Sequence, residues 1–257
     1  MPNIQPTAVV APGAELGAGV EVGAYSVIGP NVKIGLRTKI MPHVFIDGWT
    51  TLGAECTVFP FASLGTQTQD LKYKGGAPRV EIGDRTTIRE YVTVNQATND
   101  GDFTKVGSDC HIMAYSHIAH DCIVGNGVIM ANCATLAGHL VVEDFVGIGG
   151  LCGVHQFVRL GKMSYIGGCS KITQDIPPFM IADGTPLEVH TINSVGMTRR
   201  GVGEAAQALL KKAYKIIYRE GLSTRQALEK IEAEIELVPE IQYLVSFIKA
   251  SSRGIAK

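Results

Sequence analysis

Aliphatic residues recur at every sixth position through most of the chain. The run begins at Ile4 and continues in steps of six to Leu64, resumes in the same phase at Ile82, and resumes again from Val106 to Ile172. Helices repeat about every 3.6 residues and strands every two, so neither element alone explains this period. We therefore interpret each hexad as a short strand followed by a turn.

A second inward position lies two residues before each aliphatic one, because alternate residues of a strand point to the same face. Small or β-branched residues occupy it, and so do four of the six cysteines: Cys56, Cys110, Cys122 and Cys152. A reactive thiol needs exposure and a lowered pKa. These cysteines are therefore predicted to fill a narrow core.

Three hexads would form one triangular coil of eighteen residues, and stacked coils would pair their strands in parallel about 4.8 Å apart. The residue after the aliphatic position is often glycine, as at Gly35 and Gly149, which we expect at a sharp backbone corner where a side chain would crowd. The repeat pauses at residues 66–79 and 96–104, which we interpret as loops leaving the prism.

The pattern changes after Pro177 and Pro178. An apolar stripe at helical spacing covers residues 206–217, Ser223 and Gln226 form a capping-box signature, and a further helix should begin near Pro239. The sequence thus predicts a mainly β fold: a parallel β-helix of hexapeptide repeats over residues 1–185, then a linker and a small α-helical C-terminal domain over 186–257.

Composition narrows the function classes. The 257 residues carry a formal net charge of −1 and are 46% hydrophobic, so there is no broad basic field to attract nucleic acid or an anionic membrane. The first residues lack a signal-peptide pattern, and no stretch approaches about eighteen uninterrupted apolar residues. We expect a cytoplasmic protein with no nucleic-acid partner and no stable membrane insertion.

Coil arithmetic places candidate chemistry on one edge of the prism. Residues eighteen apart in an uninterrupted run stack on one another, so His120 should lie beneath Gly138, and Asp121 beneath His139. Histidine is the side chain whose ordinary pKa suits proton transfer near neutrality. A glycine there leaves its backbone N–H accessible. This arrangement favours a catalytic edge.

His117, His155 and Gln156 fall in neighbouring positions, so four of the seven histidines are expected along this edge. One alternative is a set of solvated surface histidines. Another is zinc, because the spacing of His117 and His120 resembles half a metal site. The zinc interpretation lacks a third ligand, since Cys122 is predicted to point into the core.

Three motifs follow one another along the predicted edge. They are His-Ile-Ala-His-Asp-Cys at 117–122, Leu-Ala-Gly-His at 136–139 and Val-His-Gln-Phe at 154–157. Together they closely resemble the UDP-N-acetylglucosamine O-acyltransferase family, and the likeness spans essentially the whole chain. The resemblance implies a left-handed β-helix, a handedness that periodicity does not give, and a homotrimer with sites between adjacent prisms.

The resemblance also implies roles for individual residues. His120 would be the general base, Asp121 would orient its imidazole, and the N–H of Gly138 would hold the developing oxyanion. Contacts to sugar, phosphate or acyl chain would come from Asp70, Lys72, His117, His139 and Gln156. The nucleotide end would be bound by His155, Asn193, Arg199 and Arg200. Gly168 would lie at the floor of the acyl-chain site, and no cofactor or metal is implied.

The implied reaction moves an (R)-3-hydroxyacyl group from acyl carrier protein to the 3-position of UDP-N-acetylglucosamine, or of its 3-amino analogue, as the first step of lipid A synthesis. The acidic carrier protein would dock on basic residues of the first helix, for which the alternative is a solvated face. Ser194 and Val195 stand where many relatives carry an acidic residue after Asn193, so the acceptor stays open. Other candidates are a related N-acyltransferase, a zinc carbonic anhydrase and a non-catalytic scaffold.

Overall fold

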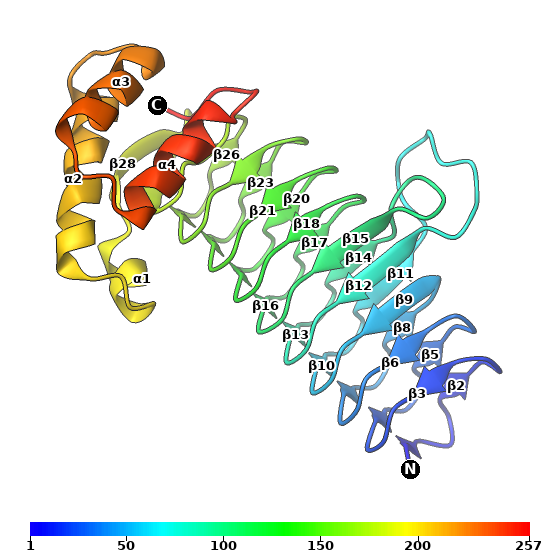
Figure 1. The fold of residues 1–257 in the computed structure, drawn as a ribbon. Helices are drawn as coiled ribbons and strands as arrows, with labels where there is room; N and C mark the ends of the chain where they lie inside the picture. Colours follow the sequence, from blue (N-terminus) through cyan, green and yellow to red (C-terminus); the bar gives the residue numbers. More distant parts are fainter.

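The chain winds into a triangular prism that carries helices at its C-terminal end (Figure 1). This computed structural model describes all residues, 1–257. Three sheets form the faces of the prism, and neighbours within each sheet are mostly three strands apart in sequence. Each coil therefore contributes one strand to each face, as the hexad pattern predicts.

The three sheets are named A, B and C. Sheet A has eleven strands: β1 (Asn3–Ile4), β4 (Glu21–Val22), β7 (Lys39–Ile40), β10 (Thr57–Val58), β13 (Thr87–Ile88), β16 (His111–Ile112), β19 (Ile129–Met130), β22 (Gly147–Ile148), β25 (Tyr165–Ile166), β27 (Met180–Asp183) and β28 (Glu188–Ile192). Sheet B has nine: β2 (Val9–Val10), β5 (Val27–Ile28), β8 (Phe45–Ile46), β11 (Ser63–Thr66), β14 (Thr93–Asn95), β17 (His117–Ile118), β20 (Thr135–Leu136), β23 (Gly153–Val154) and β26 (Lys171–Ile172). Sheet C has eight: β3 (Glu15–Leu16), β6 (Lys33–Ile34), β9 (Trp49–Leu52), β12 (Arg79–Ile82), β15 (Phe103–Val106), β18 (Ile123–Val124), β21 (Val141–Val142) and β24 (Arg159–Leu160).

Strand register confirms the eighteen-residue coil and locates the loops. His117 pairs with Thr135 in parallel, eighteen residues on, whereas Ser63 pairs with Thr93 across a longer excursion. The excess residues lie at 67–78, between β11 and β12, and at 96–102, between β14 and β15. Both loops leave the prism where strands of sheet B lead into sheet C, and both project on the same side (Figure 1).

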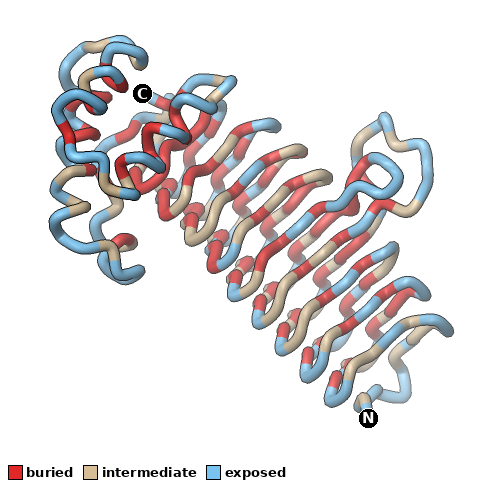
Figure 2. Tube along the Cα trace, viewed as in Figure 1, coloured by how far each residue is buried: buried red, intermediate tan, exposed pale blue.

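The hexad positions form the core. Ile28, Ile46, Leu64 and Ile118 are all fully buried, and buried residues follow the inside of the coil along the prism (Figure 2). Ile4 is an exception at 42% exposed, because no coil covers the first one. The parallel pairing of successive coils in three sheets confirms the predicted parallel β-helix.

The glycines after the aliphatic positions have a different role from the one expected. The sharp turn falls two residues later, where non-glycine residues such as Arg37 and Leu151 adopt φ near +60°. Gly35 is needed because a Cβ there would lie 2.5 Å from the carbonyl carbon of Gly53 in the next coil. A Cβ on Gly149 would lie 2.5 Å from the Gly168 nitrogen. Crowding was predicted correctly, and its source is the neighbouring backbone.

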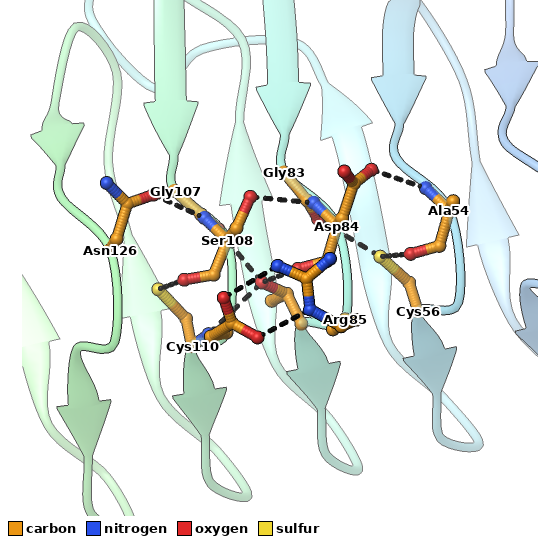
Figure 3. Close-up of polar contacts among 11 residues, drawn as sticks. Ala54, Cys56, Gly83, Asp84, Arg85, Gly107, Ser108, Cys110 and Asn126 are labelled. Atoms are coloured by element: carbon orange, nitrogen blue, oxygen red, sulfur yellow. Dashed lines mark hydrogen bonds and ion pairs between the residues drawn. The ribbon is translucent and has the colours of Figure 1, made fainter.

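Side chains satisfy the backbone at the corner joining sheet C to sheet A (Figure 3). The Ala54 N–H donates to Asp84 Oδ1 at 2.7 Å, the Asp84 N–H to Ser108 Oγ at 3.0 Å, and the Ser108 N–H to Asn126 Oδ1 at 2.9 Å. Each of these three N–H groups therefore finds its acceptor one coil further along. Such pairing removes the cost of leaving backbone donors without partners.

Four helices follow the last coil: α1 (Ser194–Arg199), α2 (Glu204–Arg219), α3 (Thr224–Glu234) and α4 (Pro239–Lys249). The capping box of Ser223 and Gln226 and the start of α4 at Pro239 are confirmed. Helix α1 was not predicted. Strand β28 continues sheet A antiparallel to β27 as far as Ile192, while the domain division at residue 185 stays a prediction. None of the helices combines the length and apolarity that crossing a bilayer requires.

The core cysteines lead to a first prediction. Burial raises the pKa of the Cys110 thiol to about 11 and that of Cys122 to about 12, and Cys56 and Cys152 are also buried. Since the thiolate is the reactive form, alkylation of the native protein near pH 7 should spare these four thiols until the chain is unfolded. Peptide mass spectrometry with and without denaturant measures this. Early modification of Cys122 would contradict the packed core.

Candidate active site

The corner joining sheet B to sheet C carries the chemistry. His120 and Asp121 follow β17, and Gly138 and His139 follow β20 one coil later. The His139 N–H donates to the His120 carbonyl at 3.1 Å, which confirms the predicted stacking. The loops at 67–78 and 96–102 leave this same corner in the preceding coils, so they overhang it.

His120 and Asp121 form a closely held pair. The imidazole Nδ1 lies 2.7 Å from Asp121 Oδ2, and the two side chains are only 13% and 10% exposed. The Asp121 N–H donates to Thr104 Oγ1 at 2.8 Å, and the Thr98 N–H lies 3.3 Å from both carboxylate oxygens. A carboxylate on Nδ1 selects the tautomer with a proton there. The Nε2 lone pair is then free to accept a proton.

Gly138 lies directly against the His120 ring. A Cβ on Gly138 would lie 2.3 Å from His120 Cε1 and 2.5 Å from Nε2, so only glycine permits this approach. No backbone carbonyl accepts the Gly138 N–H. At the corner in Figure 3, equivalent N–H groups are paired with a side chain from the next coil. Here the donor stays open beside the imidazole.

Asp70 and His139 complete the cluster. His139 Nε2 lies 3.7 Å from Asp121 Oδ2, and its ring meets that of His120 edge-on at 5.1 Å. The Lys72 N–H donates to Asp70 Oδ1 at 3.0 Å, and this hydrogen bond is the main cause that lowers the pKa of the Asp70 carboxyl. Asp70 is therefore an anion facing two imidazoles. Coil arithmetic did not find this contact, because Asp70 arrives on a loop.

The other predicted histidines do not converge on this cluster. His117 lies on the outer face of sheet B, where its Nδ1 is 2.7 Å from Thr93 Oγ1. Burial, and then the charge on His120, lowers the pKa of His117. His155 is exposed, with Nδ1 3.1 Å from the Gln156 carbonyl oxygen. All four histidines lie along this edge as predicted, but only the rings of His120 and His139 are in contact.

The metal alternative also changes. Possible ligand atoms of Asp70, His120 and His139 lie within 4.8 Å of one another, and His117 is not a member of this group. The three-residue group therefore uses His120 without the partner that its spacing from His117 suggested. His120 Nδ1 is already hydrogen-bonded to Asp121, so a ligand role would have to use Nε2, the nitrogen suited to proton transfer.

Three of the four predicted nucleotide residues lie on a different face. Asn193, Arg199 and Arg200 line a cavity of about 500 Å³ between α1 and the outer face of sheet A. The Arg200 guanidinium sits 4.3 Å above the Phe145 ring, and Asn193 caps α1 by accepting the Gly196 N–H. Gly168 lies at the corner joining sheets A and B, with a prospective Cβ 3.2 Å from the Gly150 carbonyl oxygen. One chain thus distributes the predicted site residues over three regions.

Two family models match parts of this chain. The model for Udp N-acetylglucosamine O-acyltransferase, domain 2, matches residues 175–256, and a bacterial transferase hexapeptide model matches residues 103–138. An acyl-[acyl-carrier-protein]–UDP-N-acetylglucosamine O-acyltransferase of Thermodesulfovibrio yellowstonii is 49% identical over all of both chains. This chain belongs to the UDP-N-acetylglucosamine O-acyltransferase family.

Solved structures of this acyltransferase family agree. LpxA of Acinetobacter baumannii superimposes with a TM-score of 0.95 at 42% identity, covering 99% of each chain. The UDP-N-acetylglucosamine acyltransferase of Bacteroides fragilis gives a TM-score of 0.96 at 40% identity, covering 98% of this chain and 99% of the other. The helical C-terminal part is therefore common to them as well as the prism.

The contact between Gly138 and His120 gives a second prediction. The Gly138→Ala variant should fold, because Gly138 does not require a positive φ, but its methyl group must displace the His120 ring. A crystal structure of this family member with G138A should show the displaced imidazole. Gly153→Ala is the matched control, since a Cβ there meets nothing within 4 Å. An unmoved His120 in G138A would refute the steric argument.

Proposed function

We propose that this chain transfers an (R)-3-hydroxyacyl group from the thioester of acyl carrier protein to the 3-position of UDP-N-acetylglucosamine, the first step of lipid A synthesis. One observation carries the proposal: a carboxylate-paired imidazole faces an unpaired backbone N–H across an outer corner. A relative with 49% identity over the full length carries the name of this activity. A general base beside an oxyanion donor is what acyl transfer to a hydroxyl group requires.

The proposed acyl transfer has two steps, attack on the thioester and collapse of the intermediate. His120 Nε2 takes the proton of the sugar hydroxyl while its oxygen attacks the thioester carbonyl carbon. The carbonyl electrons move onto the oxygen, and the Gly138 N–H donates to that oxyanion. The intermediate collapses, the carbon–sulfur bond breaks, and the departing thiolate takes the proton from His120. Asp121, 2.7 Å from Nδ1, stabilises the imidazolium between the two steps.

Substrate contacts divide between the two regions. Asp70, Lys72 and His139 surround the position before His120 and would hold the sugar, with His117 and Gln156 along the route of the acyl chain. Arg199 and Arg200 would bind the diphosphate, since guanidinium groups match phosphate oxygens. Asn193 and His155 would contact the nucleotide, and Gly168 would leave room for a long acyl chain.

A homotrimer completes the proposal. The basic cavity under α1 opens on sheet A, whereas His120 lies at the corner between sheets B and C. A single UDP-sugar would bridge both regions if the corner of one copy faced the cavity of the next. Cyclic packing of three prisms supplies three such junctions.

The proposal includes two acceptor atoms, the 3-hydroxyl oxygen of UDP-N-acetylglucosamine and the amine nitrogen of its 3-amino analogue. Val195 is 63% exposed at the start of α1 and lines the cavity beside Asn193, so that turn offers no carboxylate to a ribose hydroxyl. The 3-amino analogue is therefore included as an acceptor. Assays with both UDP-sugars distinguish them by the ester or amide product.

Basic surface residues support the choice of partner, and free cysteine thiols support the choice of compartment. The basic residues exposed on α2 are Lys211, Lys212, Lys215 and Arg219. We propose that the acidic carrier protein docks there by charge complementarity. All six cysteines are free, which suits a reducing compartment such as the cytoplasm.

Replacing the base tests the activity. His120→Ala should lower kcat/KM for acyl transfer by at least about 10²-fold, the scale of general acid–base catalysis. His190→Ala is the matched control: His190 Nε2 also pairs with a carboxylate, Asp183 Oδ1 at 2.6 Å, but that pair is exposed and remote from the corner. Equal rates for H120A and the native protein would exclude the mechanism.

Mixing variants tests the shared site. His120→Ala and Arg199→Ala chains should each be nearly inactive alone. Denatured together and refolded, they should regain about a quarter of native activity, because random trimers place an intact corner against an intact cavity at that frequency. Sites built within one chain would regain nothing on mixing.

A further inference from the structure

Thr98 lies at the centre of the cluster although neither the hexad pattern nor the family motifs indicate it. It belongs to the loop at 96–102, and its side chain is covered, with the residue 5% exposed. Its Oγ1 is 3.0 Å from His120 Nδ1 and 3.5 Å from Asp70 Oδ2, while its N–H points at both oxygens of Asp121 at 3.3 Å. Three members of the proposed active site therefore meet at one residue.

We propose that Thr98 is a positioning residue. Its hydroxyl group helps to hold the proton on His120 Nδ1 and links that imidazole to the Asp70 carboxylate through hydrogen bonds. The inference rests on the proposed acyl transfer for its kinetic consequences. Thr98 does not touch the reacting atoms in this proposal; it acts through the imidazole and the two carboxylates.

The hydrogen-bond donors and acceptors around the Thr98 hydroxyl group support this role. An ionised carboxylate can only accept hydrogen bonds, and the Lys72 N–H lowers the pKa of the Asp70 carboxyl. The Thr98 hydroxyl therefore donates to Asp70, and its lone pair accepts from His120 Nδ1–H, which it shares with Asp121. Both acceptors hold the proton on Nδ1. Nε2 is thus kept as the free base, facing Gly138.

The loop is held independently of the Thr98 side chain. The Gln96 N–H donates to the Thr66 carbonyl at 3.0 Å, and the Ala77 N–H donates to Asp100 Oδ1 at 2.7 Å, which joins the two loops. Removing the hydroxyl should therefore leave the backbone in place. It should also leave the Thr98 N–H directed at Asp121.

The test compares Thr98→Val, which keeps the shape and removes the hydroxyl, with Thr98→Ser, which keeps the hydroxyl. Thr98→Val should lower kcat about tenfold, the scale of one hydrogen bond to a charged group, with a smaller change in KM. Loss of an acceptor destabilises the imidazolium, so the acid limb of the kcat/KM profile should move to lower pH. Thr98→Ser should restore both.

Imidazole nitrogen resonances supply a readout that does not depend on activity. In Thr98→Val, the ¹⁵N signals of His120 should show a loss of the pure Nδ1–H tautomer, while those of His117 stay unchanged. Thr93→Val is the matched control, because Thr93 Oγ1 contacts His117 Nδ1 at 2.7 Å; it should alter the His117 signals and not those of His120.

The outcomes separate the two proposals. A native protein without acyl transfer refutes the proposed function, while the resonances still test Thr98. An active native protein whose Thr98→Val variant keeps its pH profile and His120 signals refutes the positioning role. Failure of Thr98→Ser to restore the profile would equally refute it, because the hydroxyl would then not be the acting group.

Discussion

In-register pairing of successive coils is the constraint on which the molecule depends. Each strand of a coil is hydrogen-bonded to the corresponding strand of the next coil. A residue in one coil therefore restricts the size of the side chain at the stacked position, eighteen residues later in an uninterrupted run. A side chain at position 35 would clash with the backbone of Gly53, and a side chain at position 138 would clash with the ring of His120. The same pairing that stacks the aliphatic core also stacks the imidazole against a backbone donor, so structure and proposed chemistry share one cause.

The candidate active site uses this regularity and also departs from it. At the corner in Figure 3, Asp84 and Ser108 each accept a hydrogen bond from a backbone N–H of the preceding coil. At the corner joining sheets B and C, two loops replace simple turns and cover the next coils with polar groups. Gly138 is left without an acceptor there. A rigid repeat thus positions the reacting groups, and irregular segments bring the residues that adjust them.

The sequence predicted those features that depend only on spacing. The coil length, the inward cysteines and the stacking of His120 with Gly138 all follow from counting residues. Counting could not place Asp70 or Thr98, because their loops do not keep the period. It also overestimated the convergence of His117 and His155, since a shared edge does not make side chains meet. Helix α1 is only six residues long and contains Gly196, so it left little periodic signal.

The two ends of the prism differ, and this sets how the molecule should come apart. The last coils are covered by β28 and the helices, whereas the first coil has no neighbour below it and leaves Ile4 at 42% exposed. In a linear array each coil is stabilised mainly by its neighbours. Local unfolding should therefore begin at the N-terminal coil and proceed coil by coil toward the C-terminal end. Several intact turns separate that end from His120, so partial opening there would leave the imidazole in place.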